Sequence, residues 1–166
     1  MIPVKERLSA LFIIGVAVLL LDQATKYIVI HYIHQRFVVI PGLLALIHVH
    51  NKGVVFGMFN NGHSLFGPKL LIAAQVVVFV VLMYVYLSFK DLTRLSMVSL
   101  SMIVSGAIGN IIDRIRLGYV VDFVDAHIKT VHWYIFNIAD SAITIGAILL
   151  AIDLLMAGKK QRPEVR

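Results

Sequence analysis

Two aspartates in apolar surroundings, Asp122 and Asp140, are the residues whose type and placement best suit catalysis. Asp122 falls in the apolar run Gly118-Tyr-Val-Val-Asp-Phe123, and Asp140 follows Phe136-Asn-Ile-Ala. Two carboxylates held within a few ångströms of each other cannot both ionise easily, so one keeps its proton. The ionised carboxylate can then take a proton from water while the protonated one polarises a peptide carbonyl, as in aspartic proteases. Spacing alone leaves open whether the two carboxylates meet.

A cap signal at the start of the last apolar segment bears on the charge of Asp140. Asn137 is a favoured N-cap residue, which predicts a helix from residue 138 with Asp140 at its third position. A lone Asp at that position commonly serves only as a cap partner. If Asp140 belongs to a pair, it is the ionised member, because a helix N-terminus favours negative charge.

Small residues occur at helical spacing along the third apolar segment. Four residues that lie four apart share one face of a helix: Ser101, Ser105, Gly109 and Asp113. Small side chains on that face predict close helix packing. The polar end of the segment, from Asn110 to Arg114, admits two interpretations. It is either an interfacial ion pair or a set of groups that hold an extended substrate backbone.

The composition places these residues in a membrane protein. Of 166 residues, 60% are hydrophobic and 14% charged, and the mean hydropathy is +0.90. These values exclude a disordered chain, a coiled coil and an ordinary soluble domain, and they argue against nucleic-acid binding. The absence of cysteine excludes thiol catalysis and Cys-ligated zinc. Four segments are apolar and long enough to span a bilayer, at about residues 8–30, 70–89, 95–112 and 138–157.

The Lys and Arg residues predict the orientation of these spans. Eight of them fall in three short stretches on one side: Lys5, Arg7, Lys90, Arg94, Lys159, Lys160, Arg162 and Arg166. Six others are spread thinly over two long loops, at about residues 31–69 and 113–137. The denser side is expected to be cytoplasmic, so both termini are predicted to be cytoplasmic.

The two long loops carry strand signals. Leu46 to His50 alternates apolar and polar residues, Trp133 to Phe136 is a strand-like aromatic run, and Asn60-Asn-Gly-His63 is typical of a turn. We therefore expect one domain over residues 1–166: an all-α polytopic membrane protein of four transmembrane helices, with a small β-sheet cradle on the outer (periplasmic or extracytoplasmic) face.

Five short motifs occur in order along the chain: Asp22-Gln-Ala-Thr-Lys26, Asn51-Lys-Gly-Val-Val-Phe56, Gly109-Asn-Ile-Ile-Asp-Arg114, Val120-Val-Asp-Phe123 and Phe136-Asn-Ile-Ala-Asp-Ser141. Together they resemble lipoprotein signal peptidase, the bacterial signal peptidase II family. The resemblance extends over nearly the whole chain and includes its length and number of spans. One departure is Val54-Val55, where many members have two alanines.

The resemblance implies an aspartyl endopeptidase of the bacterial inner (cytoplasmic) membrane. Such an enzyme removes the signal peptide of a prolipoprotein whose Cys carries diacylglycerol, cutting just before that Cys. The resemblance further implies a monomer that works among membrane lipid, uses no cofactor or metal and binds inhibitors of the globomycin type.

The same resemblance assigns residues to roles. The catalytic dyad would be Asp122 and Asp140. Five residues would line the substrate cleft: Asn51, Gly53, Asn110, Arg114 and Asn137. Three more would support it: Asp22, Lys26 and Asp113.

Four other functions fit the sequence less well. A proton channel is disfavoured because the ionisable groups gather at one face, with Asp153 alone near the other end. A zinc hydrolase would draw on His48, His50, His127 or His132, but no His-Glu-x-x-His motif is present. A serine protease would need Ser141, which lacks a Gly-x-Ser-x-Gly turn. A Gly-x-Gly-Asp protease is disfavoured because Val-Val precedes Asp122.

Overall fold

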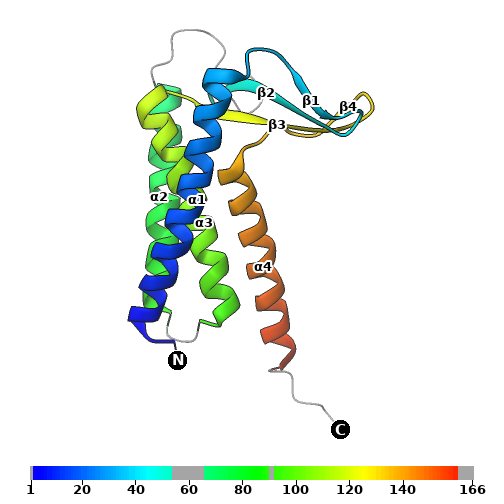
Figure 1. Ribbon diagram of the computed structural model, residues 1–166. Helices are drawn as coiled ribbons and strands as arrows, with labels where there is room; N and C mark the ends of the chain where they lie inside the picture. The colour runs from blue at the N-terminus through cyan, green and yellow to red at the C-terminus, as the bar shows by residue number, and fades with distance from the viewer. Residues whose placement is uncertain (1, 54–65, 90–91, 161–166) are drawn as a thin grey trace.

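Four long helices lie side by side, and a small sheet crosses one end of them (Figure 1). The computed structural model describes residues 2–53, 66–89 and 92–160. The helices are α1 (Val4–Tyr32), α2 (Phe66–Ser88), α3 (Arg94–Leu117) and α4 (Ile138–Lys160). All four are long and apolar enough to cross a membrane, which confirms the predicted number of spans.

The sheet is antiparallel and has the order β1-β2-β3-β4. Its strands are β1 (Phe37–Ile40), β2 (Leu44–Asn51), β3 (Val120–Ile128) and β4 (Val131–His132). The sheet extends beyond the N-terminal end of α4 (Figure 1). The start of α1 and the end of α4 lie at the opposite end of the bundle. The predicted small sheet is therefore present, and the predicted strand at Leu46 to His50 is part of β2.

The third helix is longer than the predicted span of 95–112. It continues to Leu117 and ends at Gly118, whose positive φ of 80° suits a glycine C-cap. Asp113 and Arg114 therefore lie on the helix and not in a loop. Hydropathy ended the predicted span too early, because these charged residues face the protein interior and not lipid.

Two strand predictions need correction. Residues 120–128 form a central strand, which the sequence pattern did not predict. The aromatic run Trp133 to Phe136 is not a strand, and only Phe136 forms a bridge, with Val124. The predicted turn at Asn60 to His63 and the Val54-Val55 pair lie outside the described residues.

The central helix, α3, packs against the other helices through small side chains. Ser101, Ser105, Gly109 and Asp113 are all buried, as the four-residue spacing predicted. A Cβ on Gly106 would meet the backbone carbonyl of Ala139 in α4. This close approach fixes the start of α4 against α3.

A buried cation links the other ends of α1 and α2. Arg7 is 3% exposed and donates from Nη1 to the carbonyl oxygens of Tyr86 and Phe89. Arg7 therefore satisfies backbone acceptors that the end of α2 leaves without an intrahelical partner. This contact lies at the end of the bundle that is away from the sheet.

Candidate active site

Asp122 is enclosed on β3, where it pairs with Val49 of β2. Its side chain is 2% exposed, and both carboxylate oxygens accept hydrogen bonds. Oδ1 accepts from Nδ2 of Asn137 at 2.7 Å, and Oδ2 accepts from Nδ2 of Asn51 at 2.8 Å. The sheet thus positions Asp122, since Asn51 ends the neighbouring strand.

Asp140 lies in the first turn of α4, and the predicted cap is confirmed. The backbone N–H of Asp140 donates to Oδ1 of Asn137 at 2.8 Å, and the N–H of Asn137 donates to Oδ2 of Asp140 at 3.3 Å. This reciprocal pair is a capping box. Oδ1 of Asp140 also accepts from Nδ2 of Asn110 at 2.8 Å, so two donors orient the carboxylate, one from the backbone and one from a side chain.

Asn137 contacts both aspartates. Asn137 is fully buried, with its amide nitrogen on Asp122 and its backbone N–H on Asp140. The structure therefore brings both carboxylates to a single residue. The sequence spacing of Asp122 and Asp140 alone did not predict this convergence.

Each of the three asparagine amides has its orientation fixed by a donor on its oxygen. Oδ1 of Asn51 accepts from the N–H of Gly53 at 2.8 Å, and Oδ1 of Asn137 accepts from the N–H of Asp140. Oδ1 of Asn110 accepts from Nζ of Lys26 at 3.2 Å. The amide nitrogen of each must then face a carboxylate, so the aspartates are surrounded by oriented donors.

The surroundings of Asp122 favour its protonated form. Burial raises the pKa of Asp122 to about 6, and the nearby charge of Asp140 acts in the same direction. The hydrogen bonds from Asn51 and Asn137 oppose this rise. A carboxyl group with this pKa can hold a proton near neutral pH, which suits the acid member of a pair.

Two cavities open beside the aspartates. The one next to Asp122 has a volume of about 880 Å³, and the one next to Asp140 has a volume of about 440 Å³. Asn51, Gly53 and Arg114 line the first of them. The structure therefore places these three residues beside the dyad, on an accessible surface.

Tyr134 is a site residue that the sequence did not reveal. It lines both cavities, and Nδ2 of Asn51 donates to its hydroxyl oxygen at 3.0 Å. Burial raises the pKa of Tyr134, and the charges of Asp122 and Asp140 add to the rise. The sequence predicted a strand over its aromatic run, and no local signal marks Tyr134 as a site residue.

The three residues expected to support the cleft form a buried ion cluster. Nζ of Lys26 lies 2.8 Å from Oδ2 of Asp22 and 2.8 Å from Oδ2 of Asp113. Gln23, which sequence reasoning did not single out, donates from Nε2 to both carboxylates. The cluster contacts Asn110 through the hydrogen bond that Nζ of Lys26 donates to the Asn110 side chain.

One group of ligand-type side chains lies away from the dyad, on β3 and β4. Asp125, His127 and His132 have donor atoms within 4.8 Å of one another. Nη2 of Arg36 lies 3.1 Å from Oδ2 of Asp125 and 3.2 Å from Nε2 of His127. The guanidinium of Arg36 therefore already contacts side-chain atoms of Asp125 and His127 that a metal ion would need as ligands. Metal-free chemistry stays a prediction.

Ser141 shows no arrangement that suits a nucleophile. Its hydroxyl donates to the backbone carbonyl of Asn137 at 2.9 Å, one turn back in the chain. A serine nucleophile requires a general base within hydrogen-bond reach. The bond to a carbonyl oxygen instead marks Ser141 as part of the first turn of α4.

Known proteins are similar to this chain over most of its length. The family described as Signal peptidase (SPase) II matches residues 14–156. A lipoprotein signal peptidase of Geobacter metallireducens is 42% identical over 145 residues, covering 86% of this chain and 88% of the relative. Another, of Thermodesulfovibrio yellowstonii, is 46% identical over 133 residues, covering 80% and 85%.

Solved structures show the same fold. One bacterial membrane enzyme, solved at 2.3 Å resolution, has a TM-score of 0.80 at 33% identity and covers 95% of both chains. A second, at 1.9 Å, has a TM-score of 0.78 at 34% identity and covers 89% of this chain and 93% of its own. The chain belongs to the signal peptidase II family, which is a family of proteases.

Proposed function

We propose that this protein is an aspartyl endopeptidase that removes the signal peptide from diacylglyceryl-modified prolipoproteins, cutting just before the lipidated Cys. The observation that carries the proposal is the convergence of Asp122 and Asp140 on Asn137, beside two open cavities. The names of the relatives supply the substrate class.

The two aspartates divide the chemistry between them. Asp140 is assigned as the ionised member because it lies in the first turn of a helix, where the N-terminus favours negative charge. It takes a proton from a water molecule, and the resulting hydroxide attacks the scissile carbonyl carbon. Asp122, protonated, donates a hydrogen bond to the carbonyl oxygen as negative charge develops there. The peptide C–N bond then breaks as the amide nitrogen takes up the proton that Asp140 removed from the water, which returns Asp140 to its ionised form.

The cavity beside Asp122 suits an extended peptide. Backbone N–H and C=O groups of a bound strand need partners, and Asn51, Gly53 and Arg114 lie along the wall. Apolar side chains dominate the wall beside Asp140, among them Phe136, Ile143 and Ile145. An acylated Cys can keep its chains in the bilayer while its peptide bond reaches the dyad.

The dyad and the sheet are assigned to the outer face of the bacterial inner membrane. In this orientation the short, Lys- and Arg-rich stretches are cytoplasmic, as are both termini. The enzyme acts as a monomer with membrane lipid around it, without a cofactor, and is inhibited by globomycin-type ligands. Each of these assignments extends the family relationship to this chain.

Cleavage of a lipidated substrate tests the proposal. The purified protein in detergent is incubated with a prolipoprotein that carries diacylglycerol on its Cys, and with the same precursor unmodified. Cleavage before the Cys is expected, far faster for the lipidated form, because each buried CH₂ contributes about 0.8 kcal/mol. No cleavage, or equal rates for both forms, would contradict the proposed substrate.

A further inference from the structure

We infer that the buried ion cluster of Asp22, Lys26 and Asp113 is a positioning group for both aspartates of the dyad. It holds the backbone beside each aspartate and the amide that faces Asp140. The inference rests on the proposed function, because it assigns a task to residues that lie behind the reacting groups.

The cluster is enclosed between α1 and α3. Asp22, Lys26 and Asp113 are each at most 2% exposed, and Lys26 lies at 2.8 Å from an oxygen of both carboxylates. One ammonium balances only one of the two negative charges. Buried carboxylates need further donors to offset their desolvation. The positions of those donors show which parts of the backbone the cluster holds in place.

Both carboxylates bind the backbone immediately before an aspartate of the dyad. Oδ1 of Asp22 accepts from the N–H of Ala139 at 2.9 Å, and Ala139 precedes Asp140. Oδ2 of Asp113 accepts from the N–H of Val121 at 3.2 Å, and Val121 precedes Asp122. Lys26 therefore ties together two anchors, one on α4 and one on β3.

The ammonium of Lys26 also sets the direction of the Asn110 amide. An ammonium only donates hydrogen bonds, so the atom of Asn110 at 3.2 Å from it must be the oxygen. The amide nitrogen then donates to Asp140 at 2.8 Å. Without the ammonium, the Asn110 oxygen keeps only the donor Nδ2 of Asn137, at 3.2 Å, so the amide that faces Asp140 is held less firmly.

A charge-balanced double variant separates this role from simple charge balance. The cluster carries a net charge of −1, and Lys26→Met combined with Asp113→Asn leaves Asp22 alone, again −1. The Asn at position 113 keeps an oxygen for the N–H of Val121. We expect a lower unfolding temperature, because Asp22 loses its buried ion-pair partner, and in the folded protein a kcat at least 100-fold lower, with a smaller change in KM. A kcat within threefold of wild type would overturn the role assigned to Lys26.

A second pair of variants tests the backbone anchor and does not depend on the first. Asp113→Asn and Asp113→Leu both leave the Asp22–Lys26 ion pair and have similar size, but only Asn offers an oxygen to the N–H of Val121. We expect kcat for Asp113→Leu to be at least tenfold below that for Asp113→Asn. Equal kcat values in folded protein would show that the anchor does nothing for the dyad, and would overturn the inference even if the double variant does not fold.

A matched control comes from the far end of the same helix. Arg7 is also a buried cation of α1 bound to backbone, and Arg7→Met should lower the unfolding temperature while kcat of the folded protein stays within threefold of wild type. All variants are assayed on the diacylglyceryl prolipoprotein beside the wild type. A wild type that does not cleave it would refute the proposed function. A cleaving wild type with active cluster variants would refute only the positioning role.

Discussion

Asp122 is a carboxyl group whose buried position makes ionisation costly. Two asparagine amides donate to it, yet burial still raises its pKa to about 6. The proposed mechanism needs one protonated and one ionised carboxyl group. A strand holds Asp122, whereas Asp140 lies at a helix N-terminus, which favours negative charge.

The raised pKa of Asp122 predicts a pH dependence of stability. A carboxyl group with a pKa near 3.8 unfolded and about 6 folded favours folding below pH 4, and this contribution is lost as pH rises through 6. The loss amounts to about 3 kcal/mol at most. Thermal unfolding in detergent at pH 5 and pH 7 measures the part of this loss that falls between those two values. Asp122→Asn should show a smaller difference between the two pH values, and an unchanged difference would refute the assignment.

The motifs allowed most of the site to be predicted, and contacts between distant segments account for the rest. Asp122, Asp140 and Asn137 were identified from local runs. Tyr134 and Gln23 were not, because an aromatic residue or a glutamine near a membrane surface has many ordinary roles. Their contacts join residues more than eighty positions apart, which no local pattern encodes.

At the scale of elements, α3 is the helix against which the site is built. It carries Asn110, Asp113 and Arg114 in its last two turns, and its small residues let α4 approach closely. Apolar length was enough to predict all four helices. Strand β3 could not be predicted in the same way, because its apolar run adjoins a span and its partner, β2, lies about seventy residues earlier in the chain.

A methyl group between α3 and α4 should impair both stability and catalysis. Gly106→Ala would push against the carbonyl of Ala139, directly before Asp140. Such overpacking typically costs about 1–3 kcal/mol, and here it also shifts Asp140 relative to Asp122. The unfolding temperature and kcat should both be lower than in the wild type.

Gly15→Ala is the control for this substitution. Its Cβ would meet only the hydroxyl oxygen of Ser105, at 3.3 Å, and Ala favours a helix by about 1 kcal/mol over Gly. The variant should be at least as stable as wild type. If Gly106→Ala behaves in the same way, the close packing of α3 and α4 does not set the position of Asp140.

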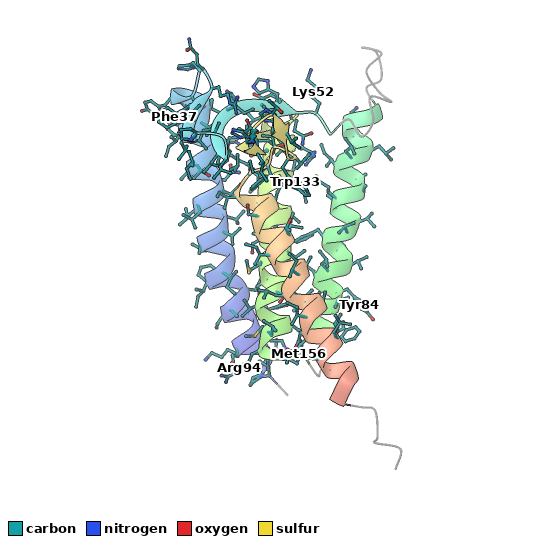
Figure 2. The ribbon with its side chains drawn as sticks, turned by 90° about the vertical axis from the view of Figure 1, so that its right-hand side faces the viewer. Phe37, Lys52, Tyr84, Arg94, Trp133 and Met156 are labelled. Atoms are coloured by element: carbon teal, nitrogen blue, oxygen red, sulfur yellow. The ribbon has the colours of Figure 1, made fainter. Side chains whose placement is uncertain are left out.

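The molecule as a whole has two chemically different ends. Figure 2 shows Lys52 and Trp133 at the sheet end and Arg94 and Met156 at the other. Apolar side chains cover the outside of the helices between them, including Phe12, Val77 and Leu155. That surface suits acyl chains, and the aromatic residues at the sheet end suit an interface.

The distribution of Lys and Arg predicts which end faces the cytoplasm. Reporter fusions after Lys90 and after Lys160 should give a cytoplasmic signal, and fusions near Gly62 and Lys129 an external one. An alkaline phosphatase and fluorescent protein pair reads out both sides. A cytoplasmic signal near Gly62 would place the dyad on the wrong side of the membrane for the proposed substrate.

The most direct measurement of the central claim is cleavage of the diacylglyceryl prolipoprotein by Asp122→Asn and Asp140→Asn. Each substitution keeps the size of the side chain but removes its titratable proton, so each should lower kcat by at least about 10²–10⁴-fold in a folded protein. The double variant should be little worse than either single one, because the pair acts as a unit. Asp153→Asn, at the far end of α4 beside Thr93 and Ser96, should keep substantial activity. A folded Asp122→Asn or Asp140→Asn enzyme that cleaves near the wild-type rate would contradict the account.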